Sequence, residues 1–200
     1  LTRPGADEVT AYRKHVDAAV AAFFSSADAE TLTKLEPLID VGLNHEQQHQ
    51  ELLLTDILHA FAQNPIPPAY QPGWTFPAAA RDGDAWITLI EGIHTVGHTE
   101  TSFHFDNEKP AHRALVGPVK LARNLVTNAE WLAFMNDGGY TTPTLWLMDG
   151  FAAAANEDWQ APGHWRKNDG KWQIMTLGGL QDIDPAAPVS HISYYEADAF

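Results

Sequence analysis

Two histidines four residues apart are the side chains of this chain most suited to chemistry. His45 and His49 lie in a segment, residues 45–54, whose composition predicts a helix. At about 100° per residue, positions i and i+4 share one face of an α-helix, about 6 Å apart along its axis. Ring nitrogens at this spacing can bind one ion, so we predict that both histidines are metal ligands.

A third protein ligand is expected to come from another element. Glu51 follows His49 by two residues, roughly 200° around the helix, so its carboxylate points away from the imidazoles. Asp56 shares the histidine face but lies about 10 Å further along, where we expect it to pair with another helix or with His59. Imidazole ligation without thiolate suits iron, copper, nickel or zinc, and the spacing does not choose among them.

Other histidine patterns are weaker. Glu46 follows His45 directly, but we interpret the register of this segment as different from the zinc-protease motif H-E-x-x-H. His94 and His98 are also four apart, in a strand-like context where such positions lie about 13 Å apart and would not chelate one ion.

Composition restricts the class of protein. The chain has 200 residues, a net charge of −14 and no cysteine. An acidic surface repels phosphate groups, so neither nucleic acid nor an anionic membrane is an expected partner. No apolar run reaches the ~20 residues of a membrane span, and no signal peptide opens the sequence. The lack of cysteine fits a reducing compartment, and we expect a cytoplasmic protein.

The first 64 residues predict helices. Residues 7–24 have an amphipathic pattern, and a second helix is expected from about Leu35 to Ala62, with Pro37 in its first turn and Asp28 as a possible cap upstream. Two such helices cannot bury their apolar faces alone, so partner helices are implied.

The composition of the sequence changes after residue 64. Residues 65–84 are rich in proline and are interpreted as a linker. Residues 86–90 predict a strand, and residues 128–135 predict a helix capped by Thr127 or Asn128 and ended by glycines. The many tryptophans are expected in the core of a loop-rich α+β module. Because residues 193–200 read as the start of a helix and the first residue is Leu1, we expect an internal piece of a longer polypeptide.

Two stretches resemble the ergothioneine-biosynthesis sulfoxide synthases. Residues 44–57 resemble the metal-binding helix of that family. The second half is similar to its formylglycine-generating-enzyme-like (sulfatase-modifying-factor) domain. The runs that carry this similarity are Phe105-Asp106-Asn107-Glu108-Lys109-Pro110-Ala111-His112, Val126-Thr127-Asn128-Ala129-Glu130-Trp131, Gly138-Gly139-Tyr140 and Pro188-Val189-Ser190-His191-Ile192-Ser193-Tyr194-Tyr195-Glu196-Ala197. The histidine helix joined to this second domain is the more specific part of the resemblance.

The resemblance implies an α+β fold in two parts. A DinB-like helical portion would cover residues 1–64. After the linker, a loop-rich domain of C-type-lectin-like fold would cover residues 85–200, truncated at its C-terminal end.

The resemblance also implies a function. The family uses non-haem Fe(II), held by three histidines, and O2 to join the sulfur of γ-glutamylcysteine or cysteine to the imidazole of hercynine, giving a sulfoxide. His45 and His49 match two of the ligands, and Gln48 matches a position that helps to orient the imidazole substrate. The third histidine is expected upstream of Leu1 and the catalytic tyrosine beyond Phe200, so this chain should hold half a metal site and be inactive alone.

Two other functions stay open on the sequence. A DinB-type thiol transferase, perhaps using zinc, would form a redox-neutral thiol adduct with the same histidines. A non-catalytic lectin-like binding module would need neither histidine for its ligand.

Overall fold

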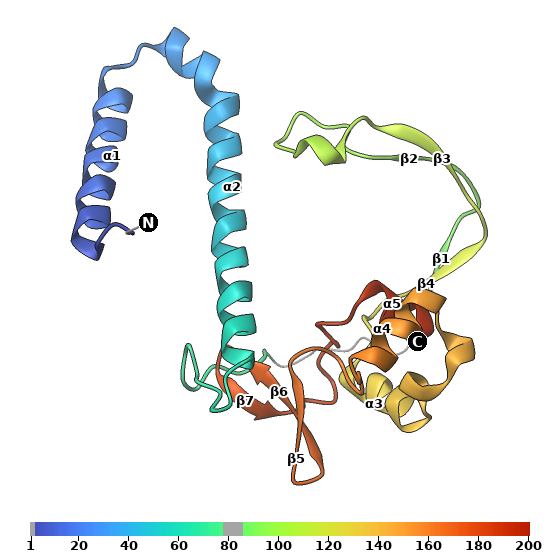
Figure 1. Cartoon of the computed structure of the whole chain (residues 1–200). Coiled ribbons are helices and arrows are strands. Elements are labelled where there is room, and N and C mark those ends of the chain that lie inside the picture. The colour runs from blue at the N-terminus through green and yellow to red at the C-terminus, as the bar shows by residue number, and fades with distance from the viewer. Residues whose placement is uncertain (1–2, 78–85) are drawn as a thin grey trace. The chain divides into compact units, whose positions relative to one another are not determined.

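A computed structural model describes residues 3–77 and 86–200 (Figure 1). The described chain separates into two compact units: unit 1 holds residues 3–50 and 98–110, and unit 2 holds the rest. Helices and antiparallel strands occur together, which confirms the α+β class. No helix within these ranges is both long and apolar enough to cross a membrane.

Two helices begin the chain. Helix α1, Ala6–Ser26, confirms the predicted first helix. Helix α2, Ala29–Ala62, begins earlier than the predicted Leu35, so Pro37 lies about two turns inside it and not in its first turn. The earlier start has a local cause: Asp28 Oδ1 accepts a hydrogen bond of 2.7 Å from the Thr31 amide, which caps the helix. This bond also lowers the pKa of Asp28.

The apolar faces of these two helices stay largely uncovered. Within the described residues, α1 has no buried residue and Ala62 is the one buried residue of α2. Large apolar side chains such as Tyr12, Leu38 and Leu53 are exposed. The partner helices implied by the sequence therefore remain a prediction.

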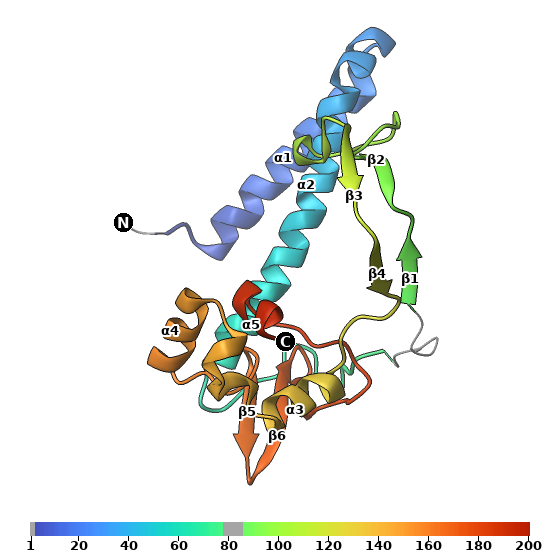
Figure 2. The same cartoon turned by 90° about the vertical axis from the view of Figure 1, so that its right-hand side faces the viewer.

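Two antiparallel strand pairs follow the proline-rich segment (Figure 2). Strand β1, Trp86–Leu89, pairs with β4, Val119–Ala122, and confirms the predicted strand. Strand β2, Gly92–Val96, pairs with β3, His112–Val116. The connection between β2 and β3 includes residues 98–110, which belong to unit 1.

A three-stranded antiparallel meander forms the sheet of unit 2. Its strands are β5 (Trp165–Asn168), β6 (Lys171–Thr176) and β7 (Gly179–Asp182). Asp169 and Gly170 connect β5 to β6 with φ values of 48° and 81°. Asp-Gly in this left-handed conformation is typical of a two-residue hairpin turn.

Three helices complete unit 2: α3 (Asn128–Asn136), α4 (Met148–Asn156) and α5 (Tyr194–Ala199). Thr127, one of the two residues predicted as the cap, caps α3 in a reciprocal capping box with Glu130. Ser193 and Glu196 cap α5 in the same way. Helix α4 has no counterpart among the sequence-based expectations.

The tryptophans predicted for the core divide into two groups. Trp131, Trp146 and Trp165 are buried, with Trp131 only 1% exposed. Trp159 and Trp172 are half-buried and line a pocket. The core prediction therefore holds for the first group, and the second is available to a ligand.

A buried carboxylate joins α5 to the segment after α3. Tyr140 donates a hydrogen bond of 2.5 Å to Glu196 Oε1, and Trp131 Nε1 donates to the Tyr140 hydroxyl at 3.4 Å. Glu196 is only 4% exposed. Burial, followed by the bond to Glu196 and its negative charge, raises the pKa of Tyr140 far above its usual value, so the tyrosine stays protonated and keeps donating.

We expect Tyr140→Phe to lower the free energy of unfolding by about 1–3 kcal/mol, because the buried Glu196 carboxylate loses a donor. Tyr194→Phe is the matched control, since Tyr194 is 70% exposed. Urea unfolding monitored by circular dichroism measures both. Equal effects of the two substitutions would contradict the assigned role.

Candidate functional site

The two predicted ligands lie side by side on α2 in unit 1. The ring centroids of His45 and His49 are 4.5 Å apart, with the ring planes at 85°. Both side chains are exposed. In the part of the chain that the structure describes, this ring contact is the only side-chain interaction of either histidine. Their nitrogens are therefore available to an ion.

The interpretation of the motif's register was wrong. The residues from His45 to His49 read H-E-Q-Q-H, which matches the letters of the zinc-protease motif H-E-x-x-H. In that motif the glutamate acts as a general base beside the metal. Glu46 is exposed here. The motif match supports metal binding by the histidines but leaves the reaction open.

The donor set fits part of a metal site. Two imidazoles on successive turns supply two nitrogen ligands suited to a divalent transition metal. In residues 3–77 and 86–200, no three histidine, aspartate or glutamate side chains are placed so that they could hold one metal ion. Gln48, three residues after His45 and directly before His49, is exposed on the same helix. It stands within one turn of both histidines, as expected for a side chain that contacts a molecule near the ion.

A groove of about 470 Å³ lies beside the preceding turn of α2 in unit 1. Helix residues such as Asp40 and Val41 form one side, and residues 101–104 of the β2–β3 connection form the other. In that connection the rings of His98 and His104 lie 4.8 Å apart. The sequence analysis missed this pair because it compared His98 only with its strand neighbour His94.

His94 and His98 do not share an environment. Strand β2 ends at Val96, and His94 Nε2 lies 2.7 Å from the Ile90 carbonyl oxygen. That the two histidines do not chelate one ion together stays a prediction. Asp56 has no hydrogen bond or ion pair within the described ranges, so the expected pairing with His59 or another helix is not observed.

A second histidine cluster lies in unit 2. His59 Nδ1, near the end of α2, is 3.3 Å from His164 Nε2, and the His164 and His191 ring centroids are 4.3 Å apart. His164 precedes β5 and His191 precedes α5, with φ values of 66° and 61°. The sequence analysis missed this cluster because its members are far apart in the chain. The rings pack against each other, and these three histidines are not placed so that they could hold one metal ion within the described residues.

Burial dominates the electrostatics of this cluster. It lowers the pKa of His164 to about 4, with positive charge on His191 and His59 as further causes. Burial also lowers the pKa of His191. The His164 Nδ1 atom is buried and has no hydrogen-bond partner among the described residues, so none of them accepts a proton there. Arg166, two residues on, donates to the carbonyl oxygens of Ala62 and Asn64 and adds positive charge nearby.

These shifts predict a pH-dependent stability. The folded state favours neutral His164, so its contribution is complete above the unfolded pKa of about 6.5 and is lost as the pH falls toward 4. We expect His164→Asn, a residue that tolerates positive φ, to remove on the order of 1–2 kcal/mol of this pH dependence after allowance for solvent screening.

Calorimetric unfolding of the native protein and His164→Asn at pH 7 and pH 5 measures the difference. His94→Asn is the control, because His94 is exposed and outside the cluster. Parallel loss of stability in the native protein and His164→Asn would contradict the assignment.

Comparison with known proteins places the chain in a family. Residues 73–200 match the sulfatase-modifying factor enzyme 1-like domain. This match begins inside the segment interpreted as a linker.

Curated relatives extend the similarity. The hercynine oxygenase of Mycolicibacterium thermoresistibile is 32% identical over 162 residues, which is 79% of this chain and 34% of that protein. The hercynine oxygenases of Mycolicibacterium smegmatis and Mycobacterium tuberculosis are 30% and 32% identical, each over 79% of this chain and 36% of their own length. The chain thus spans about a third of the length of the curated relatives it matches. Because the domain match covers well over half of its residues, the chain belongs to the family of the sulfatase-modifying factor enzyme 1-like domain.

Proposed function

We propose that this chain contributes the metal-binding helix and part of the second domain to an iron(II)-dependent, O2-using hercynine oxygenase. The reaction joins the sulfur of γ-glutamylcysteine or cysteine to the imidazole of hercynine and yields a sulfoxide. The observation that carries the proposal is the pair of imidazoles 4.5 Å apart on α2, in a chain similar to hercynine oxygenases.

The protein's part in this proposal is to hold and to orient. His45 and His49 bind the ion through neutral imidazoles, which leaves its positive charge uncompensated by the chain. The third histidine lies outside the described residues in this proposal, since no third ligating side chain joins the pair among them. Bound Fe(II) would supply the oxidising chemistry with O2, while the protein supplies binding and electrostatics.

Gln48 is proposed to orient the imidazole of hercynine. Its amide can donate to one ring nitrogen or accept from the other, so it can contact either imidazole tautomer. Gln47, the preceding residue, lies roughly 200° around the helix from His45 and cannot make the same contact. The two glutamines therefore form a matched pair for mutation.

Metal affinity tests the assignment of His45 and His49 as ligands. We expect this chain to bind Fe(II) anaerobically, and His45→Ala or His49→Ala to weaken binding about tenfold or more, because one of two ligands is lost. His15→Ala is the control, an exposed histidine on α1. Anaerobic calorimetric titration measures each affinity, with Zn(II) as a second metal. Retention of full affinity in both ligand variants would refute the site.

The KM for hercynine tests the role of Gln48. In the polypeptide as its organism makes it, Gln48→Leu should raise the KM for hercynine about five- to tenfold through loss of a hydrogen bond, with iron content unchanged. Gln47→Leu should leave the KM unchanged. Steady-state O2 consumption measures both variants, and equal KM values would remove Gln48 from the substrate site.

Product analysis in the same assay separates the alternatives. A sulfoxide formed with O2 consumption supports the proposed reaction. A redox-neutral thiol adduct on a zinc-loaded protein would establish a thiol transferase. Peptide hydrolysis would instead indicate that the H-E-x-x-H sequence is the motif of a zinc protease.

A further inference from the structure

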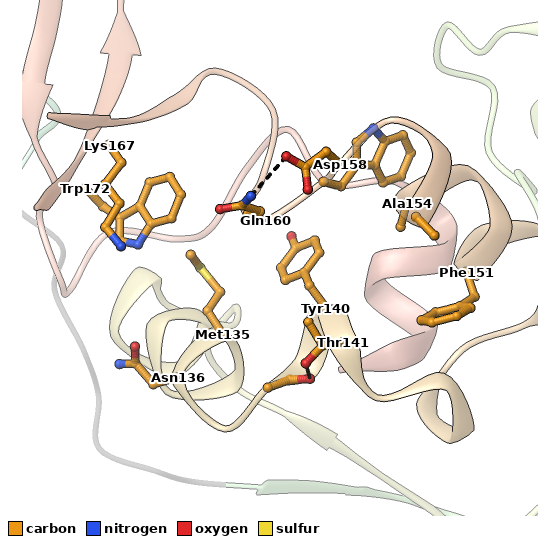
Figure 3. Close-up of a pocket in the computed structure, with 13 residues that line it drawn as sticks. Met135, Asn136, Tyr140, Thr141, Phe151, Ala154, Asp158, Gln160, Lys167 and Trp172 are labelled. Atoms are coloured by element: carbon orange, nitrogen blue, oxygen red, sulfur yellow. Dashed lines mark hydrogen bonds between the residues drawn. The ribbon is translucent and has the colours of Figure 1, made fainter.

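A pocket in unit 2 is lined by none of the residues proposed to bind the metal or hercynine. Its volume is about 520 Å³, within the range of small-molecule sites. The walls come from the end of α3 and the following turn, the second half of α4 and its following loop, and the β5–β6 hairpin (Figure 3). His45, Gln48 and His49 are not among its lining residues.

Two opposite charges line this pocket without an ionic partner. Lys167 Nζ lies 5.5 Å from the centre of the Trp172 ring, and Asp158 Oδ2 accepts a hydrogen bond of 3.1 Å from Gln160. Neither forms a salt bridge within the described chain. Lys167 and Trp172 lie toward one end of the pocket, and Asp158 lies away from them (Figure 3).

Both polar and apolar side chains lie between the two charges. In Figure 3 the Gln160 amide, which donates to Asp158, lies between Asp158 and the pair Lys167 and Trp172. The side chains of Met135 and Tyr140 lie below it in the same view. The Tyr140 hydroxyl is committed to Glu196, so it presents the ring rather than a free polar group. Half-buried Met135 and Trp172 offer polarisable surface to a flat or aliphatic body.

The Asp158 end favours a cation. Asp158 follows the C-terminus of α4, where the helix dipole adds negative potential. Glu157 does not line the pocket but accepts a bond of 2.9 Å from Trp159 Nε1, whose side chain does, so its negative charge lies close to this end. A cation alone would still meet the ammonium of Lys167, and an anion alone would meet these carboxylates. A molecule that carries both a positive and a negative group can place each group beside the opposite charge of the pocket, so that neither group is repelled.

We propose that this pocket binds a small zwitterion of the amino-acid class with an apolar or aromatic body. Its ammonium group contacts Asp158, its carboxylate contacts Lys167, and its body packs on Met135 and Trp172. The Lys167 ammonium, held over Trp172 by cation–π attraction, moves to the carboxylate when the ligand enters. The site is independent of the proposed metal chemistry.

Three probes that share an indole ring test the charge assignment. L-tryptophan carries both charges, tryptamine carries only the positive charge, and indole-3-propionate carries only the negative charge. Calorimetric titration measures their affinities for the protein. We expect L-tryptophan to bind about fivefold more tightly than either partner, a modest factor because both protein charges are exposed.

Matched variants locate the two contacts. Asp158→Asn should weaken tryptamine and L-tryptophan about fivefold and spare indole-3-propionate, while Lys167→Met should weaken indole-3-propionate and L-tryptophan and spare tryptamine. The controls are Asp169→Asn and Lys171→Met on the same hairpin. Asp169 has φ 48° and Asp158 has φ 53°, so both aspartates share a left-handed backbone that asparagine tolerates.

Indole N–H resonances report the position of binding. Bound L-tryptophan should shift the Trp159 and Trp172 signals, identified by Trp→Phe variants, and leave buried Trp165 unchanged. No saturable binding of any probe, equal affinity for all three, equal losses in the control variants, or shifts confined to other tryptophans would each overturn the proposal.

Discussion

The packing of unit 2 depends on one buried carboxylate. Glu196 caps α5 through Ser193 and accepts the hydroxyl of Tyr140, so a single side chain joins a helix terminus to the turn after α3. A charge in this position is stable only while its donors are present, because an unpaired buried carboxylate costs several kcal/mol. Around it pack Tyr140, Trp146, Ala154 and Ala199. The polar contact therefore fixes which aromatic faces are buried and which, including Trp159 and Trp172, remain beside an open pocket.

The elements that the sequence predicts best are those with a local signal. Thr127 with Glu130 marks the start of α3, and the period of residues 7–24 marks α1. Helix α4 escapes prediction because Gly150 lowers its helix propensity. The structure explains the glycine: a Cβ there would collide with the Tyr195 side chain of α5. That requirement comes from a contact between distant segments, which no local pattern contains.

The candidate sites also differ in whether local sequence or the tertiary fold brings their residues together. His45 and His49 are readable because helix geometry alone brings them together. The contact between His59 and His164 joins residues 105 positions apart. The positive φ values of His164 and His191 have no signature in the sequence. The pocket around Met135 is likewise assembled from three separate segments. Half of a metal site can be recognised on one helix, whereas a complete site and a ligand pocket require the tertiary fold.

The strand pairs β1–β4 and β2–β3 leave one edge of every strand without a backbone partner in the described chain. Exposed Ile87, Ile93, Leu115 and Leu121 follow these edges. Open edges with apolar side chains can recruit strands from another molecule, which is the first step of sheet-mediated aggregation. Lys120, paired opposite Thr88, and Arg113, opposite Thr95, place charge within the same strands and oppose such stacking. The two strand pairs thus combine open edges able to extend a sheet with charged side chains that oppose such association.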